Sequence, residues 1–255
     1  MFDLPKPKLG DISAITITAP DLEKSLIFYQ SLGFKELYRA DMPFPWIQIT
    51  DEALLIMLRK DDEPYIALTY YVKDIDKLVG ELEAEGITFA TRPKANHMIK
   101  RCLMKSPDGM NVSLVNFVEG FMQPTGKTML TMAPQDFANP DKYANNVCGL
   151  FGEFAHPVAD IDKAMLFWEK LGFKILSRMT MPYEWAIISD GLSIVGLHQT
   201  TNFSSPTITF FAADMKEKID KIKSQGLTEF IDKGSANITI TTPEKQKINL
   251  FKLGM

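Results

Sequence analysis

Two side chains in the second half of the sequence, Glu153 and His198, have the chemistry of a general base or a metal ligand. Glu153 opens a run of apolar and β-favouring residues, where a carboxylate can take a proton from a bound molecule. Its alternative role is a partly solvated group paired with Lys247 or hydrogen-bonded to Asn249. His198 can act as an acid, a base or a ligand, or it lies at the surface near the end of a strand. Both readings stay open for each residue.

Three further side chains suit ligand binding. Arg59 aligns with His198 at an offset of 139 residues, and its guanidinium either clamps a carboxylate or phosphate or is solvated at a strand end. Trp46 and Trp185 each follow a turn that contains Met-Pro. Their rings either stack on an aromatic ligand or close the site by packing alone. The sequence thus offers binding candidates in both halves.

Side chains that alternate along a strand point to opposite faces of a sheet, which separates core residues from cleft residues. Ile15 and Ile17 are expected to face a helix, which leaves Ala14 on the other face. The same alternation gives a set of cleft residues that we predict to contact a ligand. They are Trp46, Met57, Arg59, Tyr71 and Ser113 in the first half, and Trp185, Thr207 and Asn249 in the second.

Four stretches of the sequence share one pattern, an Asp followed twelve residues later by a Gly. Asp is a good N-cap because its side chain accepts from the free N–H groups of the first helical turn, and Gly suits a left-handed residue at the end. The pattern predicts four short amphipathic helices. They run from Asp21 to Gly33, Asp74 to Gly86, Asp160 to Gly172 and Asp214 to Gly226.

The two halves of the chain are related by duplication. Residues 21–51 align without a gap on residues 160–190 at an offset of 139. The shared residues include Arg39 and Arg178, which we expect to form local ion pairs. Each expected helix follows a run with strand alternation, and three β-favouring runs follow the first helix. The repeating unit is therefore βαβββ, and a repeat of this kind decides the fold.

This unit resembles the glyoxalase/bleomycin-resistance/extradiol-dioxygenase superfamily, also called vicinal oxygen chelate. The resemblance rests on the motif Asp-Leu-Glu-Lys-Ser-Leu-Ile-Phe-Tyr-Gln-Ser-Leu-Gly-Phe, which starts at Asp21, and on Ser-Pro-Asp-Gly-Met-Asn-Val-Ser-Leu, which starts at Ser106. It implies an α+β fold of four βαβββ modules paired into two tandem glyoxalase-like domains, each a curled mixed sheet around a cleft. We expect domain 1 at residues 1–118, an interdomain linker at 119–147 that packs on the domains, and domain 2 at 148–255.

Metal-dependent members of that superfamily place His, Gln or Glu at four strand positions in each domain. The resemblance puts those positions at Ala14, Met57, Ala67 and Ser113 in domain 1, and at Glu153, Gly196, Thr207 and Asn249 in domain 2. A Zn²⁺ or Fe²⁺ site needs three or four strong ligands such as imidazole, carboxylate or thiolate. Because Glu153 alone has such a group, we expect no metal and no other cofactor.

The bulk composition is that of an ordinary globular protein, with 45% hydrophobic and 24% charged residues among 255. A net charge of −4 argues against a nucleic-acid partner, which would favour a basic face. Because no apolar run is long enough to cross a bilayer, we expect no membrane association. The two cysteines, Cys102 and Cys148, form no disulfide framework and suit reduced thiols in a cytoplasmic protein.

The leading hypothesis is a protein that binds a small, mostly apolar or aromatic organic molecule in a cleft without a catalytic metal, like the bleomycin-binding members of the superfamily that it resembles. The alternative is an enzyme of the lyase, isomerase or dioxygenase class that uses Glu153 and His198 as base or metal ligands in domain 2 only. His97 and His156 are expected to be structural. Whether the halves pair within one chain or across a homodimer stays open.

Overall fold

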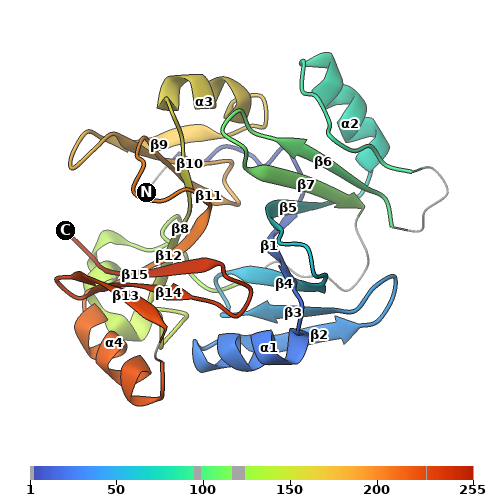
Figure 1. Ribbon diagram of the computed structural model, residues 1–255. Coiled ribbons are helices and arrows are strands. Elements are labelled where there is room, and N and C mark those ends of the chain that lie inside the picture. The colour runs from blue at the N-terminus through green and yellow to red at the C-terminus, as the bar shows by residue number, and fades with distance from the viewer. Residues whose placement is uncertain (1–2, 95–98, 117–123, 228, 255) are drawn as a thin grey trace.

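The computed structural model describes residues 3–94, 99–116, 124–227 and 229–254, which form two mixed β-sheets and four α-helices (Figure 1). The first sheet has seven strands and the second has eight. This arrangement of two tandem α+β domains confirms the fold class predicted from the repeats. His97, which we expected to be structural, lies outside the described residues.

Domain 1 contains, in chain order, β1 (Ile12–Ala19), α1 (Leu22–Ser31), β2 (Lys35–Ala40), β3 (Trp46–Thr50), β4 (Leu55–Lys60), β5 (Ile66–Val72), α2 (Ile75–Ala84), β6 (Arg101–Lys105) and β7 (Asn111–Asn116). The strand order in the sheet is β2-β3-β4-β1-β5-β7-β6. Two modules meet where β1 pairs antiparallel with β5, and each module closes with a parallel pair, β1 with β4 and β5 with β7.

Domain 2 contains β8 (Leu150–Pro157), α3 (Ile161–Trp168), β9 (Lys174–Met179), β10 (Trp185–Ser189), β11 (Ile194–His198), β12 (Thr207–Ala212), α4 (Met215–Ser224), β13 (Phe230–Gly234), β14 (Asn237–Thr241) and β15 (Lys247–Lys252). The strand order is β13-β14-β15-β12-β8-β11-β10-β9. Its two modules again meet at an antiparallel pair, β8 with β12, so the second domain repeats the plan of the first.

One of the four modules is shorter than the predicted βαβββ unit. Only β6 and β7 follow α2 in the described part of the chain, and the place of the missing strand is marked by an isolated bridge between Thr91 and Leu103. Pro93, two residues after the bridge, has no backbone N–H and cannot extend the ladder. Among the described residues, the third strand of this module is thus reduced to a single bridge.

The predicted helix ends are confirmed, with one exception at the start of α4. In three helices the N-cap carboxylate accepts from a backbone N–H three residues on, and all four closing glycines have φ between 83° and 102°. Asp214 does not cap α4 with its side chain; its carboxylate lies 3.4 Å from the ammonium of Lys218. Asp214 is the N-cap residue of α4 as predicted, but its side chain pairs with Lys218, one turn on in the same helix, and does not make the predicted capping bond.

Strand alternation separates two faces of each sheet as expected. Ile15 and Ile17 belong to a core that runs through both domains, whereas Ala14 lies in a separate apolar cluster with Leu55 and Met57. We call the face that carries this second cluster, and its counterpart in domain 2, the inner face of each sheet. The inner faces are where a ligand would contact the strands.

The two domains share buried polar contacts as well as the core. The Tyr70 hydroxyl on β5 donates to the carboxylate of Asp190 in domain 2 at 2.7 Å and lies 2.8 Å from the hydroxyl of Ser193. The corresponding carboxylate of domain 1, Asp51, accepts from the amide of Asn145 at 3.1 Å. Burial raises the pKa of both carboxyl groups. These contacts fix the two sheets relative to one another.

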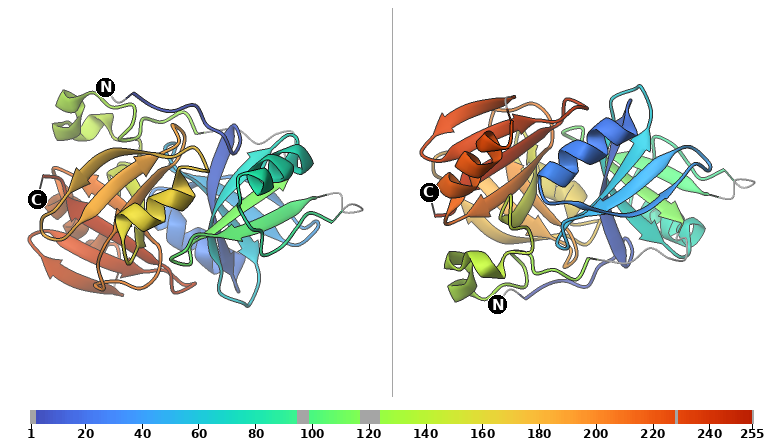
Figure 2. Two further views of the ribbon diagram at one scale, coloured as in Figure 1. Left: turned by 90° about the horizontal axis from the view of Figure 1, so that it is seen from above. Right: turned by 90° about the horizontal axis from the view of Figure 1, so that it is seen from below.

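The segment that connects the domains packs on both of them. Its residues Leu130, Met132 and Tyr143 are buried in the common core. The segment lies on the same side of the molecule as the N-terminal residues, as both views in Figure 2 show. There Lys8 bonds to the carboxylate of Glu85 at the end of α2 and to the carbonyl of Lys170 after α3, which joins the domains a second time.

The described part of the chain contains no helix that is long and apolar enough to cross a membrane. Cys102 and Cys148 are both buried and free of disulfides. Burial raises the pKa of the Cys102 thiol to about 12 and raises that of Cys148 as well, so both sulfurs are held in the unreactive thiol form.

Replacement of Tyr70 by Phe is expected to lower the free energy of unfolding by about 1–3 kcal/mol, because it removes the donor from a buried carboxyl group. Chemical denaturation measures the loss. The matched control is Tyr38→Phe, at an exposed side chain, which should change stability little. An equal effect of the two substitutions would contradict the role given to the domain contact.

His156 should make stability depend on pH. It is buried against Ser106 of domain 1, and burial lowers its pKa to about 4. The neutral ring therefore stabilises the fold above about pH 6.5, and about 3 kcal/mol of stability is lost as the pH falls from 6.5 towards 4. Denaturation curves between pH 7 and 4 should show a smaller loss for His156→Leu. Parallel curves for the two proteins would refute the assignment.

Candidate functional site

Glu153 and His198 meet on the inner face of domain 2. Glu153 lies on β8 and His198 at the end of β11, and the imidazole Nε2 is 3.1 Å from Glu153 Oε1. Both residues are buried, with exposed fractions of 4% and 9%. The other ring nitrogen, Nδ1, lies 3.3 Å from the hydroxyl of Tyr183. A chain of three titratable side chains thus runs from a loop to the centre of the sheet.

Gly196 allows this approach. It occupies the inner-face position of β11 between the two residues, and it is paired with Ala155 on β8. A Cβ atom there would lie 1.9 Å from Glu153 Oε2 and 2.8 Å from His198 Nε2. Because Gly196 has no side chain, the Glu153 carboxylate occupies the space at this strand position.

The second carboxylate oxygen of Glu153 is buried and has no hydrogen-bond partner. Neither of the partners that we considered from the sequence is used. Lys247 donates to the Thr241 hydroxyl at 2.6 Å, and the Asn249 amide contacts Thr239 and Thr209. Because buried polar atoms are nearly always satisfied, an orphan carboxylate oxygen on an inner face marks a place where a proton donor can bind.

Aromatic rings enclose His198. The Trp185 ring stacks on the imidazole with centroids 6.1 Å apart and planes 11° from parallel, and Phe203 meets it edge-on at 5.6 Å. Tyr183 contributes a third ring at 5.9 Å. His198 is thus not the surface residue that one sequence reading allowed. Burial and, after it, the charge of Glu153 raise the pKa of Tyr183, so its hydroxyl stays protonated.

Sequence reasoning missed Tyr183 and Phe203 because both lie in loops, to which strand alternation does not apply. Tyr183 had a usable signal, since it aligns with Phe44 at the offset of 139 that relates the two halves. Phe44 occupies the same place beside Arg59, with the guanidinium 5.4 Å from its ring. An aromatic residue two positions before the repeated Trp therefore covers the polar group at the end of the strand in both domains.

The inner face of domain 1 has different chemistry. Its floor is an apolar cluster in which Met57 and Tyr71, both predicted to contact a ligand, lie together with Ile12, Ala14 and Leu55. Trp46 packs against the edge of this cluster. This cluster is apolar, whereas the inner face of domain 2 carries Glu153 and His198.

Ser113, Thr207 and the two tryptophans have local partners. The Ser113 hydroxyl donates to the carbonyl of Cys102 at 3.3 Å, and the Thr207 hydroxyl donates to that of Ser205 at 3.3 Å. The indole N–H groups of Trp46 and Trp185 each donate to the carbonyl four residues earlier, at 3.2 Å. These bonds orient the side chains, and they leave the indole rings of both tryptophans as the surfaces for contact.

A divalent metal does not fit the residues at the four superfamily positions. At these positions in domain 2 Glu153 is the one strong donor, Gly196 has no side chain, and the Asn249 oxygen accepts from the Thr239 hydroxyl at 2.8 Å. His198, which lies against Glu153, adds a single further donor. Among the described residues, no group of three or more His, Cys, Asp and Glu is arranged to hold a metal ion. The donor set thus falls short of the three or four strong ligands of Zn²⁺ or Fe²⁺ sites.

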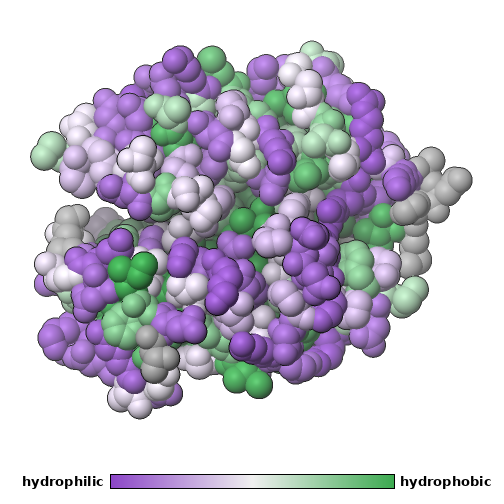
Figure 3. Space-filling model, viewed as in Figure 1, coloured by the Kyte–Doolittle hydropathy of each residue, from purple (hydrophilic) through white to green (hydrophobic). Residues whose placement is uncertain are grey.

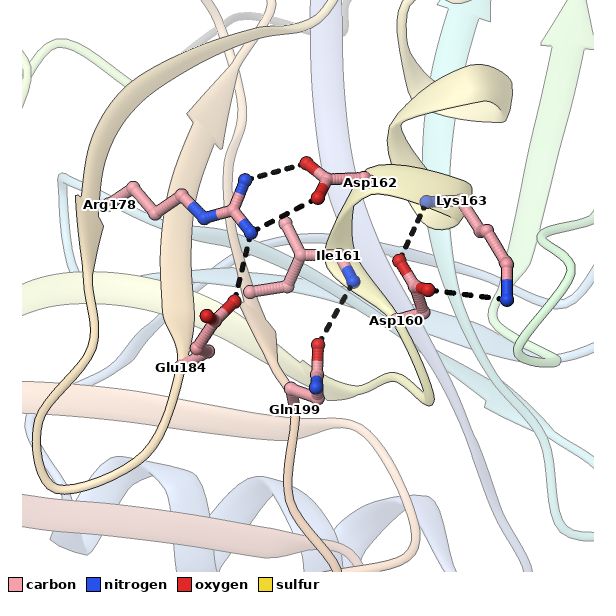
Figure 4. A network of polar contacts seen from close by, with 7 residues as sticks. All are labelled: Asp160, Ile161, Asp162, Lys163, Arg178, Glu184 and Gln199. Carbon is pink, nitrogen blue, oxygen red and sulfur yellow. Dashed lines mark hydrogen bonds and ion pairs between the residues drawn. The ribbon is translucent and has the colours of Figure 1, made fainter.

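The repeated arginines support the helices rather than the inner faces. Arg178 bonds to Asp162 on α3 at 2.6 Å and to Glu184 at 2.9 Å, and Figure 4 shows this network beside the cap of α3. Arg39 makes the matching pairs with Glu23 and Glu36. The predicted local ion pairs are confirmed.

Comparison with known proteins agrees with this architecture. A sequence model of the Glyoxalase/Bleomycin resistance protein/Dioxygenase superfamily matches residues 11–114, which span almost all of the first sheet. The second sheet repeats the same modules. The match assigns residues 11–114 to this superfamily. No match is found among curated protein sequences.

Solved structures of two-domain superfamily members are similar over the whole chain. The 2,3-dioxygenase LapB from Pseudomonas sp. KL28 is 17% identical with a TM-score of 0.61, covering 100% of this chain and 93% of that one. Homoprotocatechuate 2,3-dioxygenase from Arthrobacter globiformis is 16% identical with a TM-score of 0.59, covering 98% and 81%. A variant of the Brevibacterium fuscum enzyme is 15% identical with a TM-score of 0.60, covering 97% and 72%. At these identities the likeness concerns the fold.

Replacement of Gly196 by Ala is expected to displace the Glu153 carboxylate and to lower the free energy of unfolding by about 1–3 kcal/mol, because the new Cβ overlaps it. Denaturation measures the stability, and NMR of the His198 ring reports the changed contact. The matched control is Gly80→Ala on α2, where nothing lies within 4 Å and the helix should gain up to about 1 kcal/mol. An unchanged His198 signal in Gly196→Ala would contradict the geometry.

Proposed function

We propose that this protein is an enzyme that transfers a proton on a small, mostly apolar or aromatic organic molecule, with its active site on the inner face of domain 2. The observation that carries the proposal is the buried Glu153–His198 pair, in which one carboxylate oxygen is bound and the other is without a partner. This reading takes up the alternative of an enzyme with Glu153 and His198 in domain 2 only. The lyase or isomerase class fits it, since members of both classes that act on an acidic C–H bond begin with proton removal.

The two residues of the pair have different roles. His198 donates its Nε2 hydrogen to Glu153 Oε1 and accepts at Nδ1 from the Tyr183 hydroxyl, which fixes the ring tautomer. Glu153 Oε2 then takes a proton from a carbon beside a carbonyl of the substrate. The bonding electrons remain on the substrate as an enolate, and the same carboxyl group returns the proton to a neighbouring carbon or to a leaving group.

The surroundings favour this chemistry because they exclude water. Trp185, Phe203 and Tyr183 enclose the imidazole. A carboxylate that is screened from water is a stronger base towards a bound substrate, and flat aromatic walls suit an aromatic or apolar substrate. Thr207 and Asn249, which face the same side of their strands, are the proposed polar contacts of the substrate.

Binding without turnover is the second candidate, and the apolar floor of domain 1 favours it there. In this reading Trp46, Met57, Arg59, Tyr71 and Ser113 contact a ligand that is held but not changed. Dioxygenase activity, which is named for LapB, is left out of the proposal because the donor set of domain 2 does not fit a metal.

Hydrogen–deuterium exchange tests the proposed proton transfer without knowledge of the natural substrate. The protein is incubated in D₂O with phenylacetone, acetophenone and phenylpyruvate, and loss of the α-proton signal is followed by NMR. We expect exchange faster than in buffer, and Glu153→Gln should slow it by a factor of about 10²–10⁴. His198→Asn should also slow it, because the carboxylate loses its bound partner.

The matched control is Glu244→Gln. Glu244 is another buried acid of domain 2 with unpartnered oxygens, but it lies beside Tyr29 of domain 1. This variant should exchange at the rate of the unaltered protein. Exchange that survives Glu153→Gln would overturn the assignment of the base. Ligands that raise the melting temperature but undergo no exchange would favour the second candidate.

A further inference from the structure

Two arginines of domain 1 meet over one ring although they come from opposite arms of the sheet. Arg59 lies on β4 and Arg101 on β6, on either side of the central pair β1 and β5. Their guanidinium carbons lie 5.2 Å and 5.6 Å from the centroid of the Tyr65 ring. A ring can hold a cation over its face, but two like charges around the same ring repel each other. Something of opposite charge would stabilise the arrangement.

The protein supplies only part of that opposite charge. Asp61 pairs with Arg59 at 3.0 Å, and its own side chain is 39% exposed. Within the described ranges, no ion pair is formed by Arg101. Burial and, after it, the charge of Arg101 lower the pKa of Arg59. The inner face of domain 1 therefore carries an excess positive charge at one end of an apolar floor.

Unpartnered hydrogen-bond donors gather at the same place. The Nε–H of Arg59 and the amide nitrogen of Gln48 are both buried without an acceptor among the described residues. Gln48 lies on β3 directly across from Met57, one inner-face position away from Arg59. Buried donors without acceptors are rare, and two together indicate a missing group that carries acceptors. Asn111 Oδ1, also unpartnered, would suit a hydroxyl on that group.

We propose that domain 1 binds an organic carboxylate, with the carboxylate held by Arg59 and Arg101 and the apolar or aromatic body lying on Leu55 and Met57. A carboxylate matches the planar fork of a guanidinium and brings the acceptors that the buried donors lack. The apolar cluster next to the arginines fits the rest of such a molecule better than it fits a free inorganic anion. This site is separate from the Glu153–His198 pair and does not depend on catalysis there.

Calorimetric titration with matched pairs of probes tests the proposal. The probes are benzoate and 2-naphthoate, each compared with its carboxamide, and inorganic phosphate. We expect 2-naphthoate to bind more tightly than benzoate, and each carboxylate to bind at least about tenfold more tightly than its amide, because charge-assisted hydrogen bonds are lost in the amide. Higher salt should weaken binding of the carboxylates.

Substitutions locate the site. Arg59→Gln and Arg101→Gln should each weaken 2-naphthoate binding by about tenfold or more. Arg178→Gln, which removes a charge from the outer side of domain 2, is the matched control and should leave binding unchanged. Arg101→Gln carries the test if Arg59→Gln fails to fold, because Arg101 lies on the edge strand. Glu153→Gln should abolish proton exchange and retain carboxylate binding, which separates failure of this site from failure of the site in domain 2.

Several results would overturn the proposal. They are equal binding of amide and carboxylate, no binding of either carboxylate at millimolar concentration, phosphate binding as tight as that of 2-naphthoate, and unchanged affinity in both arginine variants.

Discussion

The contact between the two domains is the constraint on which the rest of the structure depends. Each sheet has one face that must be covered, and here helices and the other domain cover it together, so that one core runs through both domains. Because side chains alternate along a strand, burial of one face fixes which residues are left on the inner face. The positions of Glu153 in domain 2 and of Met57 in domain 1 follow from this packing and not from any local preference.

Duplication gave the two inner faces the same framework but different contents. His198 and Arg59 occupy equivalent positions at the ends of β11 and β4, and each is covered by an aromatic residue of the preceding loop. One position offers an imidazole beside a carboxylate, and the other offers a fixed positive charge beside an apolar floor. The fold therefore sets where the polar group is placed, while single substitutions set its chemistry.

The outer surface gives little indication of the difference between the two inner faces. The face in Figure 3 is largely hydrophilic, with hydrophobic residues visible in the hollow near its middle.

Much of the fold could be predicted from the sequence because it depends on short-range patterns. The spacing from Asp to Gly predicted four helices, and alternation predicted that Ile15 and Ala14 face opposite sides. The departures have local physical causes: the Asp214 side chain at the N-cap of α4 pairs with Lys218 and makes no capping bond, and the strand near Pro93 is reduced to a single bridge among the described residues. Of the candidate site, the sequence placed Glu153 and His198 on one face. It could not show that they touch, because Gly196, which makes room for the contact, reads in the sequence only as a missing ligand.

The contact between the two domains is not symmetric. Tyr70 of β5 reaches Asp190, but the residue at the matching place on β12 is Phe210, which has no hydroxyl to offer Asp51. That carboxylate is bound instead by Asn145, which comes from the connecting segment. The connecting segment thus binds one of the two equivalent carboxylates, and Tyr70 binds the other. Although the two sheets repeat one plan, the polar contacts that join them therefore differ at equivalent carboxylates.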